Sequence, residues 1–82
     1  MYLIGDIGNT DIKICLFNKN LNLIKKIRIK TILLNKRYLS KNLKFIKNYN
    51  SDIKKILFCS VVPLAYKQIK KYIEKSIKIN CI

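Results

Sequence analysis

The chain has 82 residues, half of them hydrophobic, which excludes a compositionally disordered protein and leaves room for one small domain or part of a larger one. Eighteen lysines and arginines outnumber four acidic residues, so the net charge is +14. No apolar run approaches the ~20 residues that span a bilayer. A strand pattern directly after Met1 is unlike a signal peptide with a basic start. We therefore expect a cytoplasmic protein without a membrane partner.

The positive charge raises nucleic acid as a partner. Nearly all basic residues are lysines, with arginine only at Arg28 and Arg37, whereas base recognition and bidentate phosphate binding favour arginine. Lysine, isoleucine and asparagine are all abundant and all have AT-rich codons, so genomic base composition accounts for the three excesses together. We expect only nonspecific charge attraction to nucleic acid, and a small basic nucleic-acid-binding module stays as an alternative function.

The cysteines carry no metal-binding pattern. Cys15, Cys59 and Cys81 are odd in number and widely spaced, and histidine is absent, so a zinc site would have too few ligands. We expect them to be small buried side chains in a reducing cytosol.

Three strands are expected in the first 30 residues. Tyr2–Ile7 predicts a strand that enters a tight turn at Gly8–Asp11. Ile12–Phe17 alternates apolar and polar residues and predicts a second strand. A polar turn over residues 18–20 precedes a third strand at Leu23–Ile29. These strands should form an antiparallel meander.

Helical and strand patterns alternate in the rest of the chain. Apolar residues three or four apart predict a helix over Leu33–Tyr49. The apolar run Ile56–Val62 predicts a strand buried on both faces, as in a parallel pair. Pro63 suits the first turn of an amphipathic helix. Ile79–Ile82 resembles the start of a further strand that the end of the sequence cuts off. The expected order is β-β-β-α-β-α.

The turn after the first strand carries the residues best suited to chemistry. Gly8 permits a positive φ and a close backbone approach, and Asn9 and Thr10 add N–H groups that can form an anion-binding nest. Asp6 beside such a nest suits a phosphate that carries Mg²⁺, and Lys13 is within reach of a phosphate oxygen. The alternative is an ordinary hairpin with a Gly-Asn turn, in which Asp6 only caps backbone N–H groups.

Two motifs resemble those of type III pantothenate kinases. The strand followed by Asp6-Ile7-Gly8-Asn9-Thr10 resembles the first phosphate motif of that family, which also lies at the N-terminus. Asp11-Ile12-Lys13 departs mildly from the family, where asparagine and then apolar residues are common. Phe58-Cys59-Ser60-Val61-Val62-Pro63-Leu64 resembles the family's strand that ends in Ser-Val-Val-Pro before a helix. The resemblance extends over essentially the whole chain.

The resemblance implies a fold, an activity and partners. The fold class is α/β (α+β): residues 1–82 would be a single partial domain, the N-terminal half of a ribonuclease-H-like, actin-type ATPase. The family uses ATP to phosphorylate pantothenate to 4′-phosphopantothenate, the first step toward coenzyme A. Its enzymes require Mg²⁺ and a monovalent cation, K⁺ or NH₄⁺, and form homodimers.

The resemblance also assigns residues. The ATP-binding loop would consist of Asp6, Ile7, Gly8, Asn9, Thr10, Asp11, Ile12 and Lys13, with Asp6 near the Mg²⁺. No catalytic residue is assigned, because the family's Gly-x-Asp-Arg-type segment, which supplies the general base, does not occur in this sequence. The monovalent-cation site is absent as well. We therefore expect the isolated chain to be inactive as a kinase. A further alternative is a fragment that acts through a partner chain, which its unfinished sheet would bind.

Overall fold

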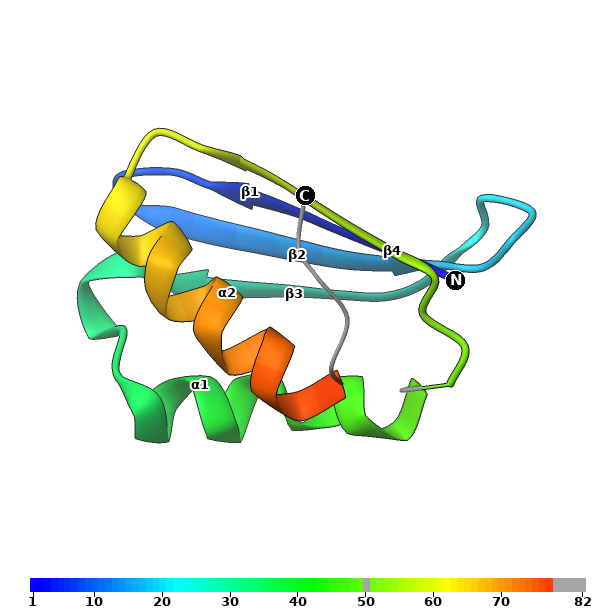
Figure 1. The fold of residues 1–82 in the computed structure, drawn as a ribbon. Helices are drawn as coiled ribbons and strands as arrows, with labels where there is room; N and C mark the ends of the chain where they lie inside the picture. Colours follow the sequence, from blue (N-terminus) through cyan, green and yellow to red (C-terminus); the bar gives the residue numbers. More distant parts are fainter. Residues whose placement is uncertain (50, 78–82) are drawn as a thin grey trace.

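A computed structural model describes residues 1–49 and 51–77 (Figure 1). Its elements are the strands β1 (Tyr2–Ile7), β2 (Asp11–Phe17), β3 (Leu23–Lys30) and β4 (Lys55–Ser60), the helices α1 (Lys36–Asn42) and α2 (Pro63–Ile77), and the short 3₁₀ helices η1 (Thr31–Leu33) and η2 (Lys44–Tyr49). The strand predicted over residues 79–82 lies outside the described residues. No helix in the described part is long and apolar enough to cross a membrane.

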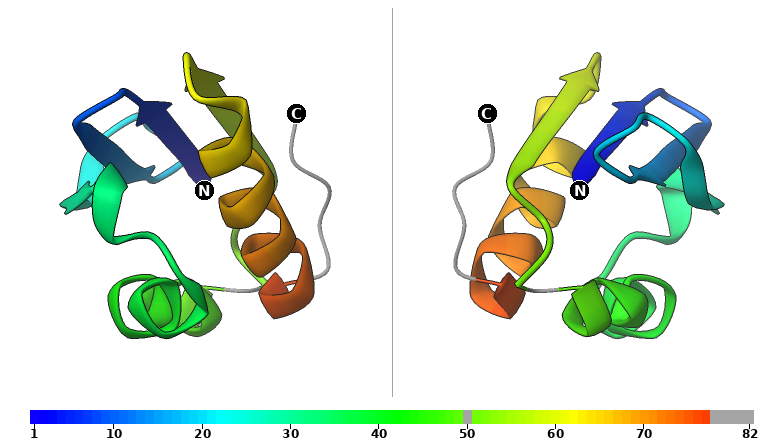
Figure 2. Two further views of the ribbon diagram at one scale, coloured as in Figure 1. Left: turned by 90° about the vertical axis from the view of Figure 1, so that its left-hand side faces the viewer. Right: turned by 90° about the vertical axis from the view of Figure 1, so that its right-hand side faces the viewer.

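The strands form one four-stranded sheet in the order β3-β2-β1-β4. β2 pairs antiparallel with β1 and with β3, which confirms the predicted meander. β4 pairs parallel with β1, as its apolar run indicated. The two end-on views in Figure 2 show α1 and α2 on the same side of the sheet. The chain is therefore a mixed α/β protein, as its patterns predicted.

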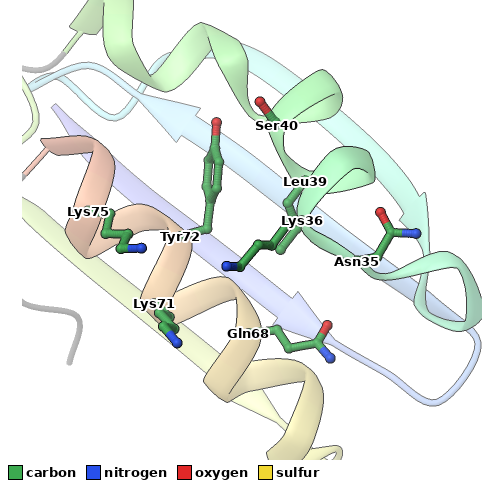
Figure 3. A pocket seen from close by; sticks show the side chains of 8 residues that line it. All are labelled: Asn35, Lys36, Leu39, Ser40, Gln68, Lys71, Tyr72 and Lys75. Carbon is green, nitrogen blue, oxygen red and sulfur yellow. The ribbon is translucent and has the colours of Figure 1, made fainter.

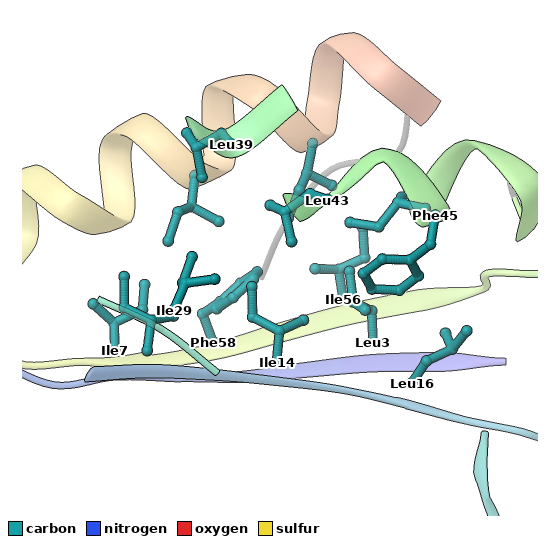
Figure 4. Packing of buried hydrophobic residues seen from close by; sticks show 14 of the residues in the cluster. Leu3, Ile7, Ile14, Leu16, Ile29, Leu39, Leu43, Phe45, Ile56 and Phe58 are labelled. Atoms are coloured by element: carbon teal, nitrogen blue, oxygen red, sulfur yellow. The ribbon is translucent and has the colours of Figure 1, made fainter. Parts of the chain in front are cut away.

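Alternation along the central strands builds the core. In β1 and β2, every second side chain is buried and points toward the helices, as expected for strands that are covered on one face. Figure 4 shows Leu3, Ile14 and Leu16 pointing from the sheet toward Leu43 and Phe45. The helices complete this core with Leu39, Ile46, Ala65, Ile69, Ile73 and Ile77.

The single helix predicted over Leu33–Tyr49 is wrong. The Asn35 side chain accepts a hydrogen bond from Tyr38 N at 2.8 Å, so α1 begins only at Lys36. The backbone leaves the α conformation at Leu43, and Ile46 N then bonds to Leu43 O over three residues. The segment is therefore divided into η1, α1 and η2.

β4 is not buried on both faces, which corrects a second prediction. Ile56 and Phe58 are buried, whereas Leu57 is 50% exposed and lies beside Ile4, which is 40% exposed. We call the side of the sheet that carries Ile4 and Leu57, away from α1 and α2, the open face. Cys59 also lies there and is exposed, so the prediction of buried cysteines is wrong for it; Cys15 is only half-buried, and Cys81 lies outside the described residues.

Gly5 permits the closest packing within the sheet. It lies opposite Phe58 in the β1–β4 register, on the side of the helices. A Cβ atom at Gly5 would lie 1.9 Å from Cε1 of Phe58. The Phe58 ring is held in place edge-on to Tyr66, with the two centroids 6.2 Å apart. Only glycine fits beneath this ring.

Candidate phosphate-binding site

The turn between β1 and β2 is a closed hairpin loop. Gly8 N donates a hydrogen bond to Asp11 O at 2.9 Å, and Asn9 and Thr10 are exposed at the tip. The positive φ expected at Gly8 is not found, since no described glycine has one. Gly8 instead allows the backbone at Asp11 to come close, because a Cβ atom at Gly8 would lie 3.1 Å from Asp11 O.

Thr31, the first residue of η1, holds this loop from the other side. Its hydroxyl donates to Gly8 O at 2.8 Å, and its N–H donates to Thr10 O at 3.0 Å. Sequence reasoning missed Thr31. The pairing of β3 with β2 would have located it: Lys30 lies opposite Asp11, and the next residue therefore lies beside the turn.

Replacing Thr31 by valine is expected to loosen the loop, because the hydroxyl is lost while the shape of the side chain is kept. We expect a loss of about 1 kcal/mol of unfolding free energy, the usual net value of one hydrogen bond. Urea unfolding measures this loss, and exchange of the hydrogen-bonded amides of Gly8 and residue 31 should become faster. Thr31→Ser keeps the hydroxyl and is the control. If both variants had the same unfolding free energy and the same amide exchange rates, the Thr31 hydroxyl would not be what holds the loop.

The structure brings Asp6 and Lys13 together beside the loop. They are register partners in the β1–β2 hairpin, and both are exposed on the open face. Cβ atoms of directly opposite residues lie about 5 Å apart. Ile7 and Ile12 are instead buried in the core, so only their backbone atoms are available to a ligand. Asp11 is half-buried, and its carbonyl closes the loop.

The end of β4 forms a second wall of the site. Val61 N donates to Ile7 O at 3.1 Å, which joins the Ser-Val-Val-Pro segment to the strand that carries Asp6. Ser60 Oγ accepts from Val62 N at 3.0 Å, and α2 then begins at Pro63. The carboxyl ends of two parallel strands and the positive end of a helix dipole thus lie at one edge of the sheet, a common ligand position in α/β proteins.

The side chains beside the loop suit a metal ion that is already bound to the phosphates of a ligand. No group of three or more potential ligands among histidine, cysteine, aspartate and glutamate occurs in residues 1–49 and 51–77. Mg²⁺ usually keeps several waters and binds one or two carboxylates together with substrate phosphates. The exposed carboxylate of Asp6 fits that mode, and the described residues form no metal cage of their own.

The chain is thus a mixed α/β protein with a polar hairpin loop after β1, which hydrogen bonds from Thr31 hold in place. A model of the type III pantothenate kinase family matches residues 2–82. A curated type III pantothenate kinase from Pelagibacter ubique (strain HTCC1062) is 42% identical over 81 residues, which are 99% of this chain and 33% of the relative. The chain belongs to the type III pantothenate kinase family, and it spans about one third of the length of that relative.

Proposed function

We propose that the chain forms the ATP-phosphate-binding part of a type III pantothenate kinase, the enzyme that phosphorylates pantothenate to 4′-phosphopantothenate. The loop from Asp6 to Lys13 receives the phosphates of ATP. The observation that supports this most is the grouping of Asp6, Lys13 and the hairpin tip beside the start of α2, in a chain that belongs to this family.

Different residues of the loop contact different parts of the triphosphate and its metal ion. The N–H groups of Asn9 and Thr10 donate to phosphate oxygens at the exposed tip. The Lys13 ammonium offsets their negative charge, and Asp6 holds the Mg²⁺ that accompanies ATP, directly or through a water. Thr31 fixes the loop in advance, so that less order has to be gained on binding.

The wider architecture belongs to the same proposal. We infer that β1 to α2 are the first half of a ribonuclease-H-like, actin-type ATPase domain, since their order and sheet connections agree with it. The complete enzyme would act in the cytoplasm as a homodimer with a monovalent cation, K⁺ or NH₄⁺. The general base that activates the pantothenate hydroxyl would come from residues outside this sequence.

A chimera tests the proposal. Residues 1–82 replace the matched third of the Pelagibacter ubique kinase, and ATP-dependent phosphorylation of pantothenate is measured with a coupled ADP assay. We expect turnover from the chimera. The isolated chain should give none, because phosphoryl transfer requires the nucleotide, the metal and the acceptor to be positioned together.

Two results would contradict the proposal. One is a chimera that melts at the temperature of the relative and yet has no activity. The other is pantothenate turnover by the isolated chain, which would show that the loop and its neighbours suffice without the other two thirds.

A further inference from the structure

A cavity separate from the hairpin loop lies between the two α helices. It has a volume of about 440 Å³ and is lined by residues of α1 and α2 together with Asn35, which caps α1 (Figure 3). This volume lies within the ~300–1,000 Å³ range of small-molecule sites. None of the residues from Asp6 to Lys13 borders the cavity.

The charged residues that line the cavity in the described part of the chain are all lysines. Lys36 comes from α1, and Lys71 and Lys75 come from α2; within residues 1–49 and 51–77, no acidic residue lines the cavity. Figure 3 shows Lys36 and Lys75 extending toward each other beside the ring of Tyr72. Two ammonium groups that converge in this way repel each other, and an anion between them removes that repulsion.

A second observation is a donor group beside this space that lacks an acceptor. The hydroxyl of Tyr72, which also lines the cavity, is buried and has no hydrogen-bond partner in the described part of the chain. A buried polar group without a partner is unfavourable, because it has lost its hydrogen bonds to water and gained none. In Figure 3 the hydroxyl lies at the end of the ring away from the ends of Lys36 and Lys75, so an acceptor for it would come from the body of a ligand rather than from its anionic group.

The walls of the cavity are apolar. Leu39 is buried, and the ring of Tyr72 stands along one side of the space. A simple inorganic anion would leave these surfaces without a partner, whereas an apolar or aromatic group would cover them. We propose that the cavity binds a small molecule that joins an apolar body to a phosphate or carboxylate group.

A nucleic acid fits the neighbouring surface less well. Beyond Lys36, a more open hollow is lined by Arg37, Lys41, Lys44 and Lys47, with Lys36 and Ser40 shared between the two. No aromatic side chain lines this outer hollow, so it lacks the stacking surface on which single-stranded bases are held. The cavity between the helices, with its aromatic wall, is the better site.

Titration with phenyl phosphate tests the proposal. The amide signals of the 82-residue chain are followed by NMR at about 150 mM salt, where attraction between distant charges is screened. We expect saturable shifts confined to α1 and α2, and nuclear Overhauser contacts between the phenyl protons and the Tyr72 ring. Inorganic phosphate and phenol, which each lack one half of the probe, should bind more weakly.

Matched variants separate the cavity from the general charge. Lys36→Gln and Lys75→Gln should each weaken phenyl phosphate binding about tenfold, which corresponds to ~1.4 kcal/mol, because each removes a charged partner of the anion. Lys26→Gln and Lys55→Gln remove the same charge from exposed positions on the sheet and should have no such effect. Tyr72→Phe keeps the ring that forms the wall, and it should leave the binding of phenyl phosphate unchanged.

Three results would overturn the proposal. Equal weakening by all four lysine variants would reduce the effect to net charge. Shifts scattered over the sheet would show that no site exists. Displacement of phenyl phosphate by a much lower concentration of a single-stranded oligonucleotide would assign the surface to nucleic acid instead.

Discussion

Replacing Asp6 by asparagine is expected to lower the kcat of the chimeric kinase about a hundredfold, with a larger loss at low Mg²⁺ concentration. Asparagine keeps the size of the side chain but not the negative charge that would hold the metal beside the phosphates. Losses of roughly 10²–10³-fold follow the removal of one group that stabilises transition-state charge. The measurement is the steady-state rate across a Mg²⁺ titration.

The control for this variant is Asp52→Asn. Asp52 is exposed in the loop before β4, and the hydrogen bonds that hold it are made by its backbone: its N–H donates to Tyr49 O at 2.9 Å and its carbonyl accepts from the N-terminal ammonium at 2.6 Å. Its substitution should leave the rate unchanged. Asp6 is exposed too, so neither change should move the unfolding free energy by more than about 0.5 kcal/mol. If Asp6→Asn retained full activity at limiting Mg²⁺, the metal-binding role would have to be abandoned.

Replacing Gly5 by alanine is expected to destabilise the chain by about 3 kcal/mol or more, the upper end of the usual cost of overpacking. The added methyl group would lie 1.9 Å from Cε1 of Phe58, a ring that is buried and packed against Tyr66. Since a domain of this size has only about 4–12 kcal/mol of stability, between about a quarter and three quarters of that stability would be lost. Urea unfolding followed by circular dichroism measures the change.

A double-mutant cycle identifies the cause. Phe58→Leu alone removes part of the ring's packing, but it also creates space above Gly5, so Gly5→Ala should cost far less in that background. Gly8→Ala is the second comparison, because its Cβ would meet Asp11 O at 3.1 Å and needs only a small shift. An equal cost of Gly5→Ala in both backgrounds would show that Phe58 is not the obstacle.

The strands were predictable because their patterns are local. Alternating apolar residues located β1 and β2 to within a residue, and Pro63 marked the start of α2. The helix before β4 was not predictable in the same way. Leu39, Leu43 and Ile46 are spaced by four and then three residues, a spacing that α and 3₁₀ helices share. The Asn35 cap and the change of backbone at Leu43 decide between them.

The candidate site was predictable as a segment but not as an assembly. The residues from Asp6 to Lys13 are contiguous, so a motif sufficed to select them. Thr31 reaches the loop only through the pairing of β3 with β2, which no spacing within the sequence reveals. Gly5 and Gly8 look equivalent in the sequence, yet one lies beneath an aromatic ring and the other closes a turn.

Because the open face carries exposed apolar residues, the net charge of the chain affects whether copies of it associate. Cys15, Ile4 and Leu57 form an apolar row across three neighbouring strands, and two copies that met through this row would bury it. A net charge of +14 on each copy opposes that approach. The repulsion extends over about 10 Å at 0.1 M salt but only about 3 Å at 1 M. Ionic strength therefore determines how concentrated the chain can become before its copies attract one another.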